Sequence, residues 1–153
     1  MNLLEVKNLS TSFHINVGTV QAVRGISFHL AQGESLGIVG ESGSGKSVTM
    51  LSVTGLLPYN AEISSDSITF DGREISGLSK KEMRKLHGSE IGMIFQDPMT
   101  SLNPLFTVEN QLTEPLKIHR HMDKASAREK ALALLRQVDI PNPEARLKQY
   151  PHE

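Results

Sequence analysis

The stretch "GIVGESGSGKSVTM", residues 37–50, decides the fold prediction because it crowds glycines and serines around one lysine directly after a short apolar run. Residues 40–47 match the pattern G-x-x-x-x-G-K-S/T of a phosphate-binding loop. Glycines let successive backbone N–H groups converge on phosphate oxygens, and the helix predicted to follow presents an N-terminus that favours anions. A chance match in a flexible turn would lack this position between a strand and a helix. The stretch therefore predicts nucleotide binding.

The side chains of this loop suggest separate roles. Lys46 is expected to bridge the β- and γ-phosphates as a point charge, and the Ser47 hydroxyl is expected to ligate Mg²⁺. A dinucleotide fingerprint is not supported, because no G-x-G-x-x-G spacing fits the loop. The predicted nucleotide-binding residues in this stretch are Gly40, Glu41, Ser42, Gly43, Ser44, Gly45, Lys46, Ser47 and Val48.

Length and composition exclude several classes of protein. The 153 residues have the size of one domain, and 16 basic against 17 acidic residues predict no nucleic-acid partner. The absence of cysteine excludes disulfides and thiolate metal sites, and the six histidines are too scattered to indicate zinc. No apolar run approaches the roughly 18 residues that span a bilayer. The start "MNLLEVKNLS" predicts a strand rather than a signal peptide.

Periodicity predicts a strand-rich first part and a helix-rich second part. Strands are predicted over "LLEVKNL", "TVQAVRGISFHL", "SLGIV", "SITFDGREI" and "EIGMIFQ", and helices over "KSVTMLSVTGLL" and "SKKEMRKLHG". Further helices are predicted over "TVENQLTEPLKIHR", "DKASAREKALALLRQV" and "NPEARLKQY".

Local signals refine these elements. The turn and cap signals are an Asp71-Gly72 turn, a capping box of Ser79 and Glu82 with Gly88 as C-cap, and N-caps at Asp123 and Asn142. Pro115 predicts a kink or break in its helix. Two helix faces are also predicted: a solvated basic face of Lys80, Lys81, Arg84 and Lys85, and an apolar face of Ala127, Ala131, Leu134, Leu135 and Val138.

The sequence around the loop resembles a known family. "VQAVRGISFHLAQGESLGIVGESGSGKS", "IGMIFQDPMTSLNP" and "KQYPHE" resemble the ATP-binding subunits of ABC transporters, and most of all the importers of oligopeptides, dipeptides and nickel. The resemblance covers essentially all 153 residues. It implies an α/β P-loop NTPase fold of the ABC type. Residues 1–96 would form the antiparallel β subdomain and a partial RecA-like core, and residues 97–153 the Q-loop and the start of the helical subdomain.

The resemblance also implies roles for residues outside the loop. Phe13 matches the aromatic that stacks on adenine, which is more often Tyr in the family; the alternative is a core residue. Gln96 matches the glutamine that reaches toward Mg²⁺ and the attacking water, so Lys46 and Gln96 are the catalytic candidates; the alternative for Gln96 is an ordinary polar residue that ends a strand. The segment 97–112 corresponds to the part pressed against membrane subunits, and the alternative is a plain surface loop.

The implied function is ATP hydrolysis coupled to uptake of peptides or nickel. ATP and Mg²⁺ would be the cofactors, and transmembrane permease subunits and a second ATPase subunit the partners, at the cytoplasmic face of the membrane. In the family, "YPHE" leads into the signature motif, the acidic Mg²⁺ partner and the switch histidine, so we expect this chain to correspond to the N-terminal part. A nucleotide-binding fragment without turnover therefore stays open. A third, unrelated class is a phosphate-loop kinase or a GTPase, and the Asn-Lys-x-Asp motif that would support a GTPase does not occur.

Overall fold

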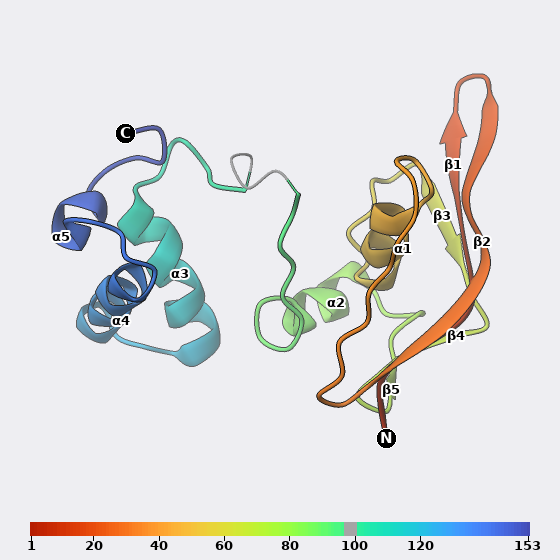
Figure 1. The fold of residues 1–153 in the computed structure, drawn as a ribbon, viewed down its shortest axis with the longest axis horizontal. Helices are drawn as coiled ribbons and strands as arrows, with labels where there is room; N and C mark the ends of the chain where they lie inside the picture. The colour runs from red at the N-terminus through yellow and green to blue at the C-terminus, as the bar shows by residue number, and fades with distance from the viewer. Residues whose placement is uncertain (97–100) are drawn as a thin grey trace. The chain divides into compact units, whose positions relative to one another are not determined.

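The computed structural model describes residues 1–96 and 101–153, which divide into two compact units (Figure 1). Unit 1 is Met1–Leu86 and unit 2 is His87–Glu153. The start of the segment 97–112 that is expected to contact membrane subunits, residues 97–100, lies outside the described residues. The predicted division into residues 1–96 and 97–153 stays a prediction.

Unit 1 is built on an antiparallel sheet. Its central strand β1 pairs with β2 along one edge and with β3 and β4 along the other, while β5 pairs with β4 (Figure 1). The elements are β1 (Asn2–Ile15), β2 (Gly18–Ala31), α1 (Lys46–Val53), β3 (Ala61–Ser64), β4 (Ser67–Phe70), β5 (Arg73–Glu74) and α2 (Lys80–Leu86).

One face of β1 is buried along most of the strand. Val6 and Leu9 are both buried although they are three residues apart, which strict alternation forbids. Asn8, between them, has a φ of 50°, and the register with β2 shifts there. This irregularity returns Leu9 and then Thr11 to the buried face. α1 contacts β1 and β2 and buries Thr49, Ser52 and Val53.

Three local predictions in unit 1 are confirmed. Asp71 and Gly72 have φ values of 48° and 73° and form the two-residue turn between β4 and β5. Ser79 N donates to Glu82 Oε2 at 2.8 Å, and Glu82 N donates to Ser79 Oγ at 3.3 Å, which is the capping box. Hydrogen bonds from the Ser79 hydroxyl and backbone lower the pKa of Glu82. The four basic residues of this helix region are exposed, as expected.

The described residues of unit 2 form three helices. They are α3 (Val108–Arg120), α4 (Lys124–Gln137) and α5 (Pro143–Arg146). Asp123 caps α4 as predicted: its Oδ1 accepts from Ala125 N at 2.9 Å and Ser126 N at 3.1 Å. The core is Ala131, Leu132 and Leu147, with Val108, Leu112 and Leu135 packed against it. The chain after α5 binds the start of α3, because Val108 N and Glu109 N donate to the carbonyl oxygens of Gln149 and Leu147.

Some helix details in unit 2 differ from prediction. Pro115 lies inside α3 without breaking it. Leu134 and Val138 are exposed, so the buried face of α4 is rotated toward Ala127, Ala131 and Leu132. The period of the sequence places these residues on neighbouring parts of the helix, and contact with Leu147 selects the face. Asn142 occupies the N-cap position of α5, but its side chain makes no capping hydrogen bond.

The two predicted buried strands "SLGIV" and "EIGMIFQ" are wrong for this structure. Residues 34–40 form no strand, and Val39 is 92% exposed. In "EIGMIFQ", residues 92–96 form no strand either, and an isolated bridge joins His87 to Ile91. A strand requires a neighbour to accept and donate its backbone hydrogen bonds, and within the described residues no strand pairs with either segment.

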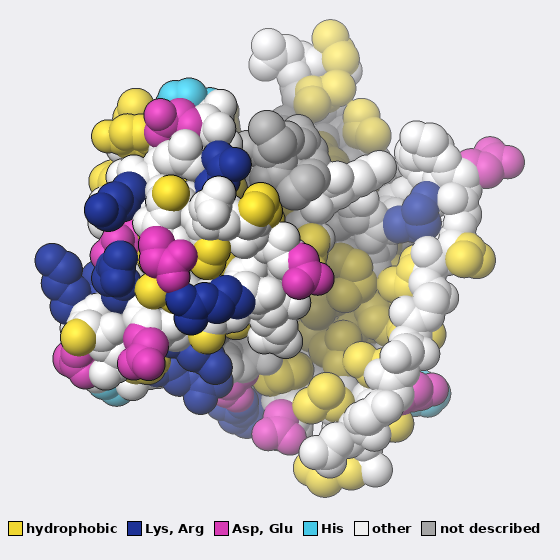
Figure 2. All heavy atoms as spheres, turned by 60° about the vertical axis from the view of Figure 1, so that its left-hand side comes forward, with side chains coloured by type: hydrophobic (Ala, Val, Ile, Leu, Met, Phe, Trp, Pro, Cys, Tyr) yellow, Lys and Arg dark blue, Asp and Glu magenta, His cyan; other side chains and the backbone are white. Residues whose placement is uncertain are grey.

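Charged side chains of both signs share the surface. On the face shown in Figure 2, Lys and Arg side chains are interspersed with Asp and Glu side chains, in keeping with the net charge of −1. Within the described part of the chain, no helix combines the length and apolarity needed to cross a bilayer.

Candidate functional site

The predicted phosphate-binding loop ends at α1 and lies directly against β2. Gly45 is the N-cap of α1 and has a φ of 89°, while Gly43 has a φ of 82°. A Cβ on Gly45 would lie 2.6 Å from the carbonyl oxygen of Ala22, whereas one on Gly43 would meet nothing within 4 Å. Glycine at position 45 therefore allows both the left-handed backbone and the close approach to β2.

The ammonium group of Lys46 lies inside the curve of this loop. Its Nζ donates to the carbonyl oxygens of Gly40 at 2.7 Å and Glu41 at 2.6 Å, and to Ser44 Oγ at 3.3 Å. Ser44 N donates to the Glu41 carbonyl at 3.3 Å, which closes the turn. The structure thus brings together residues 40–46, which the sequence predicted to form one site.

The start of α1 can bind an anion. Its N-cap residue is a glycine, so no side chain caps the helix, and the first-turn hydrogen bond runs from Thr49 N to Gly45 O at 2.8 Å. The backbone N–H groups of residues 46–48 are those that an α-helix leaves for a cap or a ligand. Ser47 is exposed in this first turn. The helix dipole adds positive potential at the same end.

A groove of about 660 Å³ joins the loop to β2. Gly40, Gly43, Ser44 and Lys46 line it from the loop, and residues 20–24 and 26 line it from β2. Among the described residues that line it are the cations Arg24 and Lys46 and no carboxylate. The shape and charge of the groove therefore suit an extended anion such as a nucleotide.

Phe13 lies beside this groove but is not among the residues that line it. It stands opposite Val20 in the β1–β2 register, and residues directly opposite each other project to the same side. Val20 lines the groove, and Phe13 is half-buried. The contribution of β2 to the groove was not predicted from the sequence. The two-residue turn at Asn16 and Val17 was the available signal, because counting back from it pairs Phe13 with Val20.

Gln96 and the loop belong to different units of the chain. Gln96 is exposed and belongs to unit 2, whereas the loop belongs to unit 1. Its roles toward Mg²⁺ and water stay predictions, as do the roles of Phe13 and Ser47. Among the described residues, no group of His, Asp and Glu side chains forms a metal cluster.

Comparison with known proteins identifies the family. The family model described as "ABC transporter" matches residues 23–153. The chain belongs to the ABC transporter family. The predicted ABC-type P-loop fold is also confirmed by a solved ABC cassette, MJ0796 bound to ADP and Pi. That structure superposes with a TM-score of 0.82 at 22% identity over 97% of this chain and 62% of its own. This likeness concerns the fold alone.

Curated members of the ABC transporter family are more similar in sequence. The dipeptide transport ATP-binding protein DppD of Bacillus subtilis is 54% identical over 99% of this chain and 45% of its own length. The oligopeptide transport ATP-binding protein OppD of the same organism is 52% identical over 99% of this chain and 42% of its own length. The chain thus spans less than half the length of these relatives.

Proposed function

We propose that this chain is the ATP-binding part of a subunit that energises an ABC importer of dipeptides or oligopeptides. The proposal rests on the geometry of the glycine-rich loop. The loop packs against β2 at Gly45, the Lys46 ammonium group bonds to the loop backbone, and the start of α1 has no side-chain cap. The names of DppD and OppD supply the solute class. Nickel, which the resemblance also implied, stays an alternative solute.

The residues present fit a nucleotide with Mg²⁺. The backbone N–H groups of residues 43–48 and the Lys46 ammonium would hold the phosphates. The Ser47 hydroxyl and Gln96 would ligate Mg²⁺, which neutralises phosphate charge when bound. The aromatic face of Phe13 and the side chain of Val20 would contact the base. Lys46 and Gln96 remain the proposed catalytic residues of the whole protein.

Unit 2 offers a candidate surface for the membrane subunits. Leu105 is 79% exposed and Phe106 is 52% exposed, at the start of a groove of about 490 Å³ that runs along α3. Gln111 holds this loop in place: its Oε1 accepts from Asn103 N at 2.8 Å, and its Nε2 donates to the carbonyl oxygens of Asn103 and Phe106 at 2.9 Å. An ordered apolar loop within the segment 97–112 supports contact with permease subunits at the cytoplasmic face.

A second ATPase subunit as partner and ATP hydrolysis as activity belong to the same proposal. The solved MJ0796 cassette bound to ADP and Pi is a dimer, which supports pairing of this subunit with a second ATPase subunit. ATP hydrolysis is proposed for the whole protein. For residues 1–153, nucleotide binding without turnover is the alternative.

The test compares nucleotide binding by the wild type, Lys46→Ala and the control Lys81→Ala, an exposed lysine of α2. Calorimetry with MgATP should show binding that Lys46→Ala weakens by about tenfold or more and Lys81→Ala leaves unchanged, because of these two lysines only Lys46 places its positive charge in the loop. Equal affinities for wild type and Lys46→Ala would refute the site. If the wild-type chain releases phosphate from ATP and Lys46→Ala abolishes this release, the chain hydrolyses ATP and does not merely bind it.

A further inference from the structure

We propose that His14 is a positioning residue that fixes the ring of Phe13 for the nucleotide base. The inference rests on the proposed function, since it assumes that Phe13 stacks on a base. His14 directly follows Phe13 on β1, and both of its ring nitrogens have partners on neighbouring strands. Nε2 lies 2.9 Å from Glu62 Oε2 of β3, and Nδ1 lies 3.2 Å from Thr19 Oγ1 of β2.

The backbone of His14 is held as well. Its N–H donates to the carbonyl oxygen of Asn60 at 2.9 Å, and Asn60 Nδ2 donates to the carbonyl oxygen of His14 at 3.2 Å. The β1–β3 ladder stops one residue earlier, at the pair of Phe13 with Ala61. The contacts of His14 therefore tie the end of β1 to β3 at the point where regular pairing ends.

These contacts act on Phe13 through the backbone. Successive side chains of a strand point to opposite faces, so His14 projects away from the face that carries Phe13 and Val20. Beyond Phe13 the β1–β2 hairpin continues as two strands, a structure that is only marginally stable by itself. Anchoring His14 to both neighbouring strands limits the movement of the backbone that carries the aromatic ring.

The experiment separates binding of the base from binding of phosphates. Affinities for MgATP and for magnesium tripolyphosphate, which has no base, are measured by calorimetry on the 153-residue chain. Phe13→Ala should weaken MgATP binding by about fivefold, the range of an aromatic contact. His14→Ala should weaken it by about two- to threefold, since an exposed pair contributes little, and His14→Gln should restore part of the loss. Tripolyphosphate affinity should not change in any of these variants.

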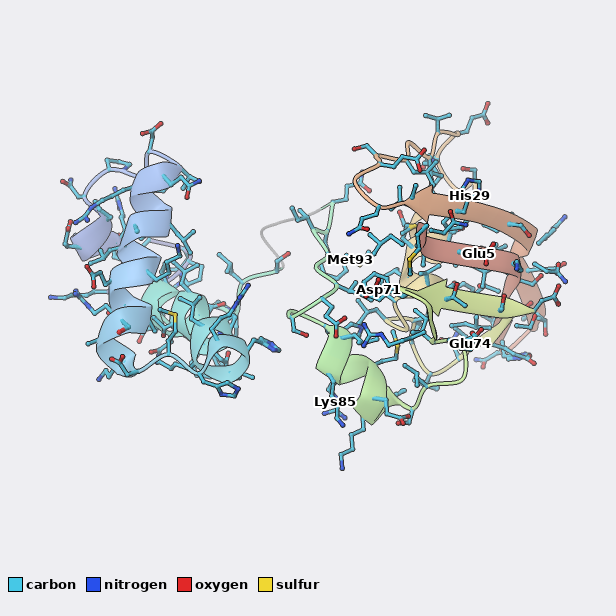
Figure 3. All side chains as sticks on the ribbon, turned by 90° about the horizontal axis from the view of Figure 1, so that it is seen from below. Glu5, His29, Asp71, Glu74, Lys85 and Met93 are labelled. Carbon is cyan, nitrogen blue, oxygen red and sulfur yellow. The ribbon has the colours of Figure 1, made fainter. Side chains whose placement is uncertain are left out.

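A double variant and a matched control complete the test. Because His14 acts through Phe13, the double variant Phe13→Ala/His14→Ala should bind MgATP no more weakly than Phe13→Ala. His29→Ala is the control: His29 is exposed on β2 and stands opposite Glu5 of β1 (Figure 3). In the β1–β2 register this pair lies toward the other end of the two strands from the pair of Phe13 with Val20. His29→Ala should leave both affinities unchanged.

The possible results are distinct. Additive losses in the double variant, an equal loss of tripolyphosphate affinity in His14→Ala, or no effect of His14→Ala on MgATP would overturn the positioning role while leaving the proposed function intact. If Phe13→Ala itself binds MgATP as the wild type does, base stacking fails and the role of His14 fails with it.

Discussion

Thr11 of β1 and Ser52 of α1 are joined by a hydrogen bond of 2.7 Å between their hydroxyl groups, and both residues are buried. Ser52 Oγ also donates to the carbonyl oxygen of Val48 at 2.6 Å. A hydroxyl has one proton, so Ser52 uses its proton for Val48 and accepts the proton of Thr11. This bond attaches α1, and with it the loop that α1 follows, to the centre of the sheet.

The direction of this hydrogen bond predicts unequal effects of two substitutions. Ser52→Ala leaves the buried Thr11 hydroxyl without its acceptor and should lower the free energy of unfolding by about 1–3 kcal/mol. Thr11→Val leaves Ser52 bonded to Val48 and should cost only about 1 kcal/mol. Urea denaturation of both variants provides the measurement. A larger loss for Thr11→Val would show that the donor and acceptor are assigned the wrong way round.

The N-cap of α4 predicts a dependence of stability on pH. Hydrogen bonds from the Ser126 hydroxyl, and then from the backbone N–H groups of Ser126 and Ala125, lower the pKa of Asp123. A lowered pKa in the folded state means that the cap stabilises the protein fully above the ordinary aspartate pKa of about 4. The stabilisation is lost as the pH falls through the lower, folded-state value.

Two substitutions of Asp123 test this cap. Asp123→Ala should have a lower Tm than the wild type at pH 7, and the difference should shrink as the pH falls below about 4. Asp123→Ser keeps an uncharged acceptor at the N-cap, so it should lie close to the wild type without the same pH dependence. Thermal unfolding followed by circular dichroism gives the Tm values. A gap between wild type and Asp123→Ala that stays constant with pH would contradict the assignment.

The segments wrongly predicted as strands make a prediction about association. Val39 is 92% exposed and Ile94 is 95% exposed, and both lie in apolar segments whose backbone groups are not paired in a sheet. Such segments invite pairing with another chain, so we expect a polypeptide of residues 1–153 to self-associate. The double variant Val39→Lys/Ile94→Lys should shift the population toward monomer.

Sedimentation velocity at increasing concentration measures this shift. Val17→Lys/Tyr59→Lys is the matched control, because it adds the same charge at residues that are 91% and 96% exposed but lie outside the two segments. It should associate nearly as much as the wild type. A wild-type chain that stays monomeric throughout would remove the basis of the prediction.

These elements show which features local sequence can predict. The Asp71-Gly72 turn, the Ser79–Glu82 capping box and the Asp123 cap depend on residues within three positions of one another, and all three are confirmed. The phosphate-binding loop is local on a slightly longer scale, since Lys46 bonds to Gly40, Glu41 and Ser44.

The features that could not be predicted depend on distant partners. An apolar run such as residues 35–39 becomes a strand only where another strand pairs with it, which the run itself does not encode. The buried face of α4 depends on Leu147, and the lining of the groove by β2 depends on the β1–β2 register. Contacts made far along the chain decide each of these outcomes.

The two left-handed glycines of the loop provide a matched pair for the last prediction. Gly43 and Gly45 have nearly equal φ values, 82° and 89°, so alanine is strained at both positions by about 1–2 kcal/mol. Their surroundings differ. A Cβ at Gly43 would meet open space, whereas one at Gly45 would lie 2.6 Å from the Ala22 carbonyl oxygen. That oxygen belongs to the backbone of β2, so neither side can yield without moving the loop or the strand.

Gly45→Ala should therefore be clearly more destabilising than Gly43→Ala. We expect about 1–2 kcal/mol for Gly43→Ala from strain alone, and about 3 kcal/mol or more for Gly45→Ala, where overpacking adds to the strain. Urea denaturation of both variants measures the difference. Since the contact with Ala22 seats the loop on β2, Gly45→Ala should also weaken MgATP binding by about tenfold or more in the molecules that remain folded. Equal losses of stability in the two variants would mean that the loop does not rest on β2 at Ala22, and the groove shared by the loop and β2 would lose its structural basis.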